Sequence, residues 1–348
     1  MKKMILSLMA VLMGTMSMQA QDDLVATLNH GSTLSTFTGE DALSLAYEAA
    51  ADGDVITLSP GVFVGVDMTK AITLRGAGYK PMASNGHMST QITGSMDITV
   101  NPEASTAFEL EGLDFLNSVY FWGDKLAAVK VSKCFFRGRV QGHGISMNAL
   151  SCIFIELIAH NYNSNKGGYK NTTLTCHNCV ISSASSAGLS DTKIGKIIAY
   201  NCILTYSWGD NIPYSVLINS IIISHANYTY YLPETCSVDH CIGINFGSTS
   251  NVFYYIVNPS NVMVEGTGET AYTNVFKTLR DISSISIYET FELTTTAAAQ
   301  YLGDDGTQVG IYGGNNPFNL DSTNPQVTKF SVSSTNENGQ LKVKINVE

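Results

Sequence analysis

The chain has 348 residues, of which only 14% are charged, and its formal net charge is −10. Ordinary globular domains carry about 25% charged residues, so this composition favours a fold that buries much of its surface. The acidic balance argues against a nucleic-acid partner, because phosphate backbones bind basic proteins. The length suffices for one large domain.

The first 20 residues have the features of a secretion signal. Lys2 and Lys3 supply a positive start, Met4 to Met13 form a short apolar run, and Met18-Gln19-Ala20 resembles a cleavage site. The apolar run is shorter than the about 20 residues that span a bilayer. We therefore expect residues 1–20 to be removed and the mature protein to be secreted, periplasmic or on the cell surface of a bacterium. It then has 17 basic against 29 acidic residues, a net charge of −12.

One pattern recurs seven times between residues 113 and 241, with steps of 18 to 27 residues. Such self-similarity indicates a stacked repeat, in which each unit buries its apolar face against its neighbours. Helical repeats run to roughly 33 residues or more, so a rung of about 20 residues predicts a parallel β-solenoid. The aligned positions are Leu113, Cys134, Cys152, Cys179, Cys202, Ser220 and Cys241.

Each repeat is predicted to be a short strand, a sharp bend and another short strand, with apolar side chains alternating toward one interior. The residue before the aligned one ends the bend, where Gly and Asn are suited because they tolerate positive φ. Both residues after the aligned one are usually apolar, as Phe135 and Phe136 are after Cys134. The pattern does not decide which of the two faces inward, or what covers the other. The bend residues are Gly112, Lys133, Ser151, Asn178, Asn201, Asn219 and His240.

Seven cysteines in an exported protein would usually indicate disulfides. An odd number cannot all pair internally, and five of the seven occupy the aligned column. We interpret them as small buried residues that fill a tight column, although disulfides between stacked neighbours are geometrically conceivable. Cys176 and Cys179 form a C-x-x-C, but both point inward on this register. A lone C-x-x-C without a second ligand pair is weak support for zinc.

The repeats and the opening of the chain resemble one superfamily. Asn before a buried small residue at a bend resembles the asparagine ladder of the pectate-lyase-like right-handed parallel β-helix superfamily. The amphipathic segment Asp41–Ala51, followed by Gly53–Phe63 and Ala71–Gly78, is similar to that superfamily's N-terminal cap helix and first rungs. The resemblance implies an all-β, single-stranded right-handed parallel β-helix, but little about activity, because one fold hosts many functions.

The expected domains are a cap at residues 21–52, a β-helix at 53–318 and a C-terminal hairpin at 319–348. Asn251–Ile256 is compatible with a further rung, and residues 261–299 are expected to form irregular final turns. Asp304–Gly314 resembles the ending of other secreted bacterial β-helix proteins and predicts a structural turn. Its two aspartates beside backbone carbonyls could hold calcium, but the loop lacks the ligand spacing of a known calcium loop, so no ligand cluster supports calcium. Val327–Ser333 and Leu341–Val347 alternate apolar and polar residues, which predicts a hairpin, expected to cover the open end of the solenoid.

Positive charge gathers between Lys130 and Lys196, where eight basic residues accompany two acidic ones. Nine residues before the aligned position stand Lys125, His143, Lys170 and Lys193, on four consecutive rungs. Rungs stack about 4.8 Å apart, so this register predicts a cationic stripe along the solenoid. Like charges that close repel one another unless solvent or an anionic ligand intervenes, and an acidic polysaccharide would supply that anion.

Cleavage of a uronate polymer by β-elimination needs cations that neutralise the carboxylate and a base that removes the adjacent proton. The candidate catalytic residues are Arg137, Arg139, His143, Lys170 and Lys193. Arginine suits carboxylates because its donors form a two-pronged fork. The alternative is that turn lysines on a solenoid are simply solvated. The sequence assigns no cofactor and no metal.

Gly142-His143-Gly144 matches the G-H-G of polygalacturonase-type hydrolases, which share the fold. Their N-T-D, Asp-Asp and R-x-K motifs are missing from this sequence, and inverting hydrolysis needs two carboxylates flanking the bond, so we reject that activity. The acidic calcium cluster of pectate lyases is also missing. The later rungs are rich in aromatic residues, which either stack on sugars or pack against neighbouring turns. These are Tyr206, Trp208, Tyr214, Tyr228, Tyr230 and Tyr231.

Two functions follow for an exported, carbohydrate-directed protein. One is a polysaccharide lyase for an acidic glycan, and the other is a non-catalytic glycan-binding or surface-structural solenoid. A base beside an arginine in an open groove would favour the enzyme, whereas a flat face with aromatic residues and dispersed lysines would favour binding. The expected partner in either case is a polysaccharide, most simply an acidic one, and the protein is expected to be a monomer.

Overall fold

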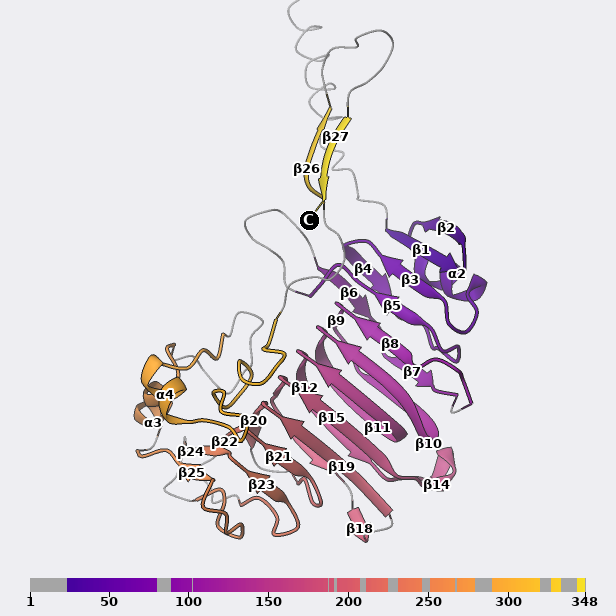
Figure 1. Ribbon diagram of the computed structural model, residues 1–348. Coiled ribbons are helices and arrows are strands. Elements are labelled where there is room, and N and C mark those ends of the chain that lie inside the picture. Colours follow the sequence, from indigo (N-terminus) through magenta and orange to yellow (C-terminus); the bar gives the residue numbers. More distant parts are fainter. Residues whose placement is uncertain are drawn as a thin grey trace, which may run out of the picture.

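The computed structural model describes residues 24–79, 89–101, 103–186, 188–190, 193–206, 211–224, 231–245, 251–266, 268–278, 290–319, 327–332 and 343–347. The expected signal at residues 1–20 lies outside them. Most of the described chain forms a parallel β-solenoid of about eight turns, which confirms the predicted fold class. Figure 1 shows its strands stacked from the N-terminal rungs to the C-terminal ones.

Three parallel sheets line the solenoid, and β10 (Val119–Ser132), β11 (Phe135–Leu150) and β12 (Ile153–His160) each contribute to more than one of them. The first sheet continues through β3 (Val55–Leu58), β5 (Thr73–Arg75), β8 (Phe108–Glu111), β15 (Thr172–His177), β19 (Lys193–Tyr200), β21 (Val216–Ile218) and β23 (Ser237–Asp239). The second contains β4 (Gly61–Val64), β6 (Thr90–Thr93), β9 (Asp114–Phe115), β16 (Val180–Ile181), β20 (Ile203–Tyr206), β22 (Ile221–Ser224), β24 (Ile242–Asn245) and β25 (Val262–Met263). The third contains β7 (Met96–Thr99) and β17 (Ala184–Ser186).

The bend between the first and second sheets is formed in each repeat by one residue with positive φ. Gly112 has φ 64°, Asn178 has φ 52° and His240 has φ 47°, and the other four predicted bend residues also have positive φ. A left-handed residue is costly for most side chains and cheapest for Gly and Asn. The positions predicted from the repeat alignment are therefore confirmed.

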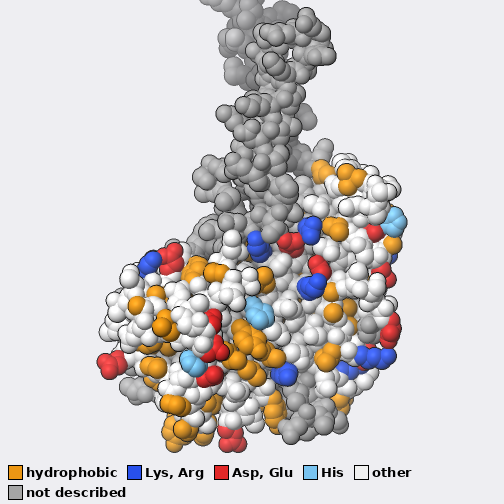
Figure 2. Space-filling model, in the orientation of Figure 1, with side chains coloured by type: hydrophobic (Ala, Val, Ile, Leu, Met, Phe, Trp, Pro, Cys, Tyr) orange, Lys and Arg blue, Asp and Glu red, His pale blue; other side chains and the backbone are white. Residues whose placement is uncertain are grey.

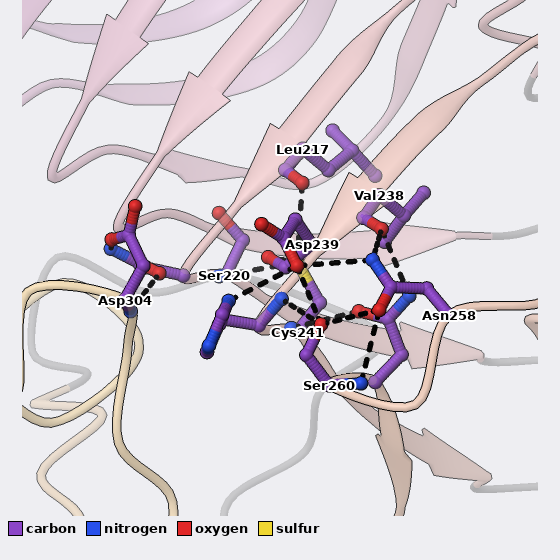
Figure 3. Close-up of polar contacts among 11 residues, drawn as sticks. Leu217, Ser220, Val238, Asp239, Cys241, Asn258, Ser260 and Asp304 are labelled. Atoms are coloured by element: carbon purple, nitrogen blue, oxygen red, sulfur yellow. Dashed lines mark hydrogen bonds and ion pairs between the residues drawn. The ribbon is translucent and has the colours of Figure 1, made fainter.

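The aligned cysteines form a ladder inside this bend. All of them are fully buried and unpaired in disulfides. The backbone N–H of Cys152 donates to Cys179 Sγ at 3.4 Å, and that of Cys179 donates to Cys202 Sγ at 3.4 Å. Ser220 continues the ladder, because its Oγ accepts from the N–H of Cys202 at 3.0 Å. The interpretation of the cysteines as small buried residues is confirmed, and Figure 3 shows the C-terminal end of the ladder around Ser220 and Cys241.

The two apolar residues after each aligned position face opposite ways. The second one points inward: the rings of Phe115 and Phe136 stack at 4.8 Å, and those of Phe136 and Phe154 at 5.1 Å. The first one points outward, yet it is also buried, because it belongs to a separate apolar cluster with residues from the C-terminal part of the chain. These outward residues are Phe135, Ile153, Val180, Ile203, Ile221 and Ile242.

The cover over the second sheet comes from the described residues between positions 264 and 318. Residues 261–299 were expected to be irregular turns, but they include β25 and two helices, α3 (Glu269–Val275) and α4 (Thr295–Gln300). Tyr272 and Phe276 of this region are buried against the cluster. The physical reason is that the outward apolar row of the second sheet needs a partner, and the chain returns to provide it.

Residues 303–319, here called the strap, run along the positive-φ bends. Asn178 Nδ2 donates to the carbonyl oxygens of Ile311 at 2.9 Å and Gly313 at 2.8 Å. The N–H of Gly310 donates to the Asn219 carbonyl at 2.8 Å. A Cβ on Gly313 would lie 1.8 Å from the Gln308 carbonyl oxygen, so this close approach requires glycine. The glycine-rich run is therefore a structural turn, as predicted, and it docks on the asparagine bends.

The N-terminal end of the solenoid is capped. Helix α2 (Ala42–Ala49) lies where the amphipathic segment predicts it, with Leu43 and Ala46 buried. Strands β1 (Val25–His30) and β2 (Thr33–Thr38) form an antiparallel pair, and β1 also pairs antiparallel with β3. No sequence pattern singles out this hairpin, which continues the first sheet at its edge.

The segment that follows β24 differs from its expected arrangement. Asn251–Ile256 forms turns rather than a strand, and beyond it Asn258 and Ser260 hold Asp239 through hydrogen bonds of 3.0 and 2.5 Å (Figure 3).

The predicted C-terminal hairpin forms, with β26 (Val327–Val332) antiparallel to β27 (Val343–Val347). It is a separate two-stranded sheet that lies beyond the solenoid in Figure 1, not across its last rungs. None of the described helices is long and apolar enough to cross a membrane.

Candidate functional site

The outer face of the third sheet carries two aromatic side chains side by side. In the 119–122 segment of β10, alternation buries Val119 and Phe121 inside the solenoid and directs Tyr120 and Trp122 outward. The Tyr120 and Trp122 rings are 6.1 Å apart and inclined by only 10°. Trp122 Nε1 donates to Asp97 Oδ1 at 2.8 Å, which fixes the indole. We call Tyr120 and Trp122 the aromatic platform.

His143 lies on the next rung, directly beside Trp122. The strand register pairs Trp122 with His143 and His143 with His160, and the ring centroids are 6.0 and 6.3 Å apart. His143 points outward but is fully buried. It is hydrogen-bonded to the short hairpin formed by β13 (Tyr162–Asn163) and β14 (Gly168–Tyr169).

The hydrogen bonds of His143 define its tautomer. His143 Nε2 is 3.0 Å from the Gly168 carbonyl oxygen, and a carbonyl only accepts, so Nε2 carries the proton. Nδ1 is then a lone pair, buried and without a partner. Burial lowers the pKa of His143, and the neighbouring Lys170 and His160 lower it further. This is the electronic state of a general base, but its basic nitrogen is closed off from solvent.

Lys170 lies against the same corner. Its Nζ is 3.3 Å from the Gly123 carbonyl oxygen and 3.6 Å from Asp124 Oδ1, and its stem lies 3.0 Å from where a Cβ on Gly144 would be. The structure therefore brings two of the five predicted residues, His143 and Lys170, together. The charge of Lys170 is already compensated by Asp124.

Arg137 and Arg139 each form an ion pair with a carboxylate. Arg137 makes a two-pronged contact with Asp114, at 2.7 and 3.0 Å, and its guanidinium lies 4.4 Å from the Phe135 ring centroid. Arg139 Nε donates to Glu156 at 2.9 Å, and this bond raises the pKa of Arg139. Both arrangements tie neighbouring rungs of the solenoid together.

Of the other two members of the predicted cationic stripe, Lys125 is not aligned with this pair. Lys125 lies in an irregular part of β10 between Trp122 and Ala127, where the register shifts, and its Nζ binds Glu103 at 3.0 Å. Lys193 is the first residue of β19, and its side chain lies outside the described part of the structure. A catalytic or binding role for the five candidates stays a prediction.

Sequence analysis does not single out the aromatic platform. The V-Y-F-W alternation of residues 119–122 is the signal that could have found it, because it places both rings on one outer face. Further aromatic pairs lie at the surface: Tyr162 and Tyr169, each 44% exposed, with rings 4.6 Å apart, and Tyr231 against Tyr254 at 4.8 Å. Of the predicted aromatic residues, Trp208, Tyr228, Tyr230 and the side chain of Tyr206 lie outside the described residues.

No group of three or more potential metal ligands occurs among the residues that the structure describes. What the third sheet presents is a pair of half-buried, nearly parallel aromatic rings flanked by paired charges, with a histidine enclosed at its edge. No known protein-family model matches the chain, and no curated protein or solved structure shows detectable similarity to it.

Proposed function

We propose that this protein is an exported β-helix of the pectate-lyase-like superfamily that binds a polysaccharide without cleaving it. The observation that carries the proposal is the nearly parallel pair of Tyr120 and Trp122 rings on the outer face of the third sheet, with ring centroids 6.1 Å apart. The spacing suits a chain of sugar rings, because consecutive pyranoses can each lay an apolar C–H face on one ring.

The surroundings of the platform suit a polyhydroxylated ligand. Asp97 holds the indole, and Gln141, which pairs with Tyr120 in the register, is half-buried on the same face. Arg139 and Glu156 form an ion pair near the Tyr120 end of the face. Such planar polar groups donate to and accept from sugar hydroxyls, while aromatic rings supply area at little conformational cost.

Pairing of the cations favours binding over catalysis. β-Elimination requires positive charge free to meet the uronate carboxylate, whereas Arg137, Arg139 and Lys170 each already contact an acidic side chain. The base that the reaction requires must also reach the substrate, and His143 is enclosed. Sugar binding on the aromatic platform requires neither an unpaired cation nor an accessible base.

A second candidate function is a polysaccharide lyase acting on an acidic glycan. The buried Nδ1 of His143, unpaired and unprotonated, is the observation that favours it. In that mechanism the β13–β14 hairpin moves aside, His143 removes the proton next to the uronate carboxyl group, and Lys170 neutralises that carboxylate. The reaction ends with an unsaturated sugar and the departing chain end.

One experiment separates the two functions. The full-length mature protein is run through affinity gels containing neutral glycans, alginate, pectate or a glycosaminoglycan, and ultraviolet absorbance follows unsaturated products in parallel. Retardation by one polymer, lost in Trp122→Ala and kept in Tyr254→Ala, supports the binding function. Tyr254 is the matched control because it is an exposed aromatic residue in a different cluster. Retardation that is unchanged in Trp122→Ala contradicts the platform, and absorbance that grows with time favours the lyase.

A further inference from the structure

A cavity of about 360 Å³ lies on the outer face of the first sheet, next to the strap. Strand residues Glu109, Lys130, Asn148 and His177 line it, and Asn316 of the strap closes one side. The volume is within the range of small-molecule sites, about 300 to 1,000 Å³. None of the residues proposed above for glycan binding belongs to it, because those side chains lie on the third sheet.

The two carboxylates that line this cavity are each paired with a cation. Glu109 Oε1 contacts Nζ of Lys130, which also lines the cavity, at 2.7 Å. Glu111 Oε2 contacts Nε of Arg75, which stands outside the lining, at 2.8 Å. Each lining carboxylate thus has a cation beside it. Figure 2 shows basic and acidic side chains next to one another on the face toward the viewer. A ligand with a net charge of either sign would disrupt one of these pairs.

The remaining walls are an aromatic ring and uncharged polar groups. The His177 ring stacks on Tyr200 with centroids 5.0 Å apart and planes inclined by 7°. Burial lowers the pKa of His177, which favours the neutral form of the ring. Leu150 adds an apolar side chain, and Ser132, Asn148 and Asn316 add donors and acceptors.

We propose that this cavity is a binding site for one neutral sugar unit, with the C–H face against Leu150 and His177 and the hydroxyl groups on Glu109, Asn148 and Asn316. The match has three parts: the volume, the pairing of both lining carboxylates with cations, and the mixture of an apolar face with planar polar groups. A purely apolar ligand would strip water from the carboxylates without replacing their hydrogen bonds. This site is separate from the aromatic platform, so the proposal for the cavity can be correct even if the proposal for the platform is wrong, and the reverse.

The test uses the full-length mature protein and saturation-transfer NMR with glucose, galactose, mannose and N-acetylglucosamine, followed by titration calorimetry of any binder. At least one sugar should bind, and its affinity should fall at least tenfold in Glu109→Gln and in Asn148→Leu. Asn316→Ala, on the exposed strap, provides a third variant if either sheet variant fails to fold. Tyr254→Ala, an exposed aromatic residue that does not line the cavity, is the control that should leave the affinity unchanged, and Trp122→Ala tests whether the sugar binds on the platform instead.

Several outcomes would overturn the proposal. One is no binding by any of the four sugars at millimolar concentrations. Another is binding that survives all the cavity variants, and a third is binding lost only in Trp122→Ala, which would place the sugar on the platform instead. Displacement of the bound sugar by inorganic phosphate would identify an anion site and would equally contradict it.

Discussion

The outer faces of the second and third sheets belong to the same rungs but have opposite roles. On the second sheet the outward side chains are apolar and buried beneath residues 264–318, and they form a second core. On the third sheet the outward side chains include Tyr120, Trp122 and Gln141, which stay partly exposed. The difference teaches that a solenoid face becomes available for recognition only where the chain does not return to cover it.

The largest expected effect tests the covered face. Ile203→Ala removes a fully buried side chain from the second core and should lower the free energy of unfolding by about 2–5 kcal/mol, since it leaves a cavity. Ile158→Ala, at a half-buried outward position on the third sheet, is the matched control and should cost under about 1 kcal/mol. Urea unfolding measures both, and equal losses would mean that the two faces do not differ.

The next prediction tests how the strap is held. Asn178→Ala removes two bonds to strap carbonyls and places alanine at φ 52°, so it should cost about 2–4 kcal/mol of unfolding free energy. Asn178→Gly loses the same bonds but tolerates the backbone, and it should cost about 1–2 kcal/mol less than alanine. Urea unfolding of the two variants separates the contributions. A glycine variant as unstable as the alanine variant would show that backbone conformation does not matter here.

The outer face of the third sheet is tested by polysaccharide binding rather than by stability. Trp122→Ala should weaken binding of the retarding polysaccharide by at least tenfold, about 1.4 kcal/mol, because half of the platform is lost. Affinity electrophoresis measures the loss, and thermal unfolding checks that the fold is intact. Trp122→Phe should recover part of the affinity, and failure of phenylalanine to do better than alanine would argue against ring stacking.

The smallest effect concerns the pH dependence of stability that arises from His143, which is enclosed at the edge of the third sheet. His143 has a lowered pKa in the folded state, so the unfolded chain takes up its proton first as pH falls. Stability should therefore decrease as pH drops below about 6.5, the usual histidine value, by less than about 1.4 kcal/mol per pH unit from this residue. His160, Lys170 and Asp124 face the ring, and of these only Asp124 favours its protonation.

Comparison with a variant isolates this contribution. His143→Gln cannot take up the proton, so its unfolding free energy should fall less steeply between pH 7 and 5 than that of the wild type. His160 and His177 also have pKa values lowered by burial and will keep part of the slope. Identical slopes in the wild type and His143→Gln would contradict the prediction, and chemical unfolding at each pH provides the measurement.

Much of the candidate site could not be predicted from residue spacing. The alignment places Lys125 in register with His143. In the structure, β10 has more residues than β11 between the pairs Trp122–His143 and Ala127–Ile145, so the register shifts there. Lys125 binds Glu103 instead. His143 and Lys170 do come together, as their shared repeat position indicates. The acids that pair with the arginines lie on neighbouring rungs and are 17 to 23 residues distant in the chain.

What the sequence by itself determined is the repeating unit. Local rules suffice for it: alternation assigns the inward side chains, positive φ selects Gly and Asn at bends, and a small residue must fill the tight inner column. Only the tertiary structure decided which outer face is covered, because that depends on contacts such as Asn178 with Ile311, 133 residues apart. No local period encodes a pairing over such a distance.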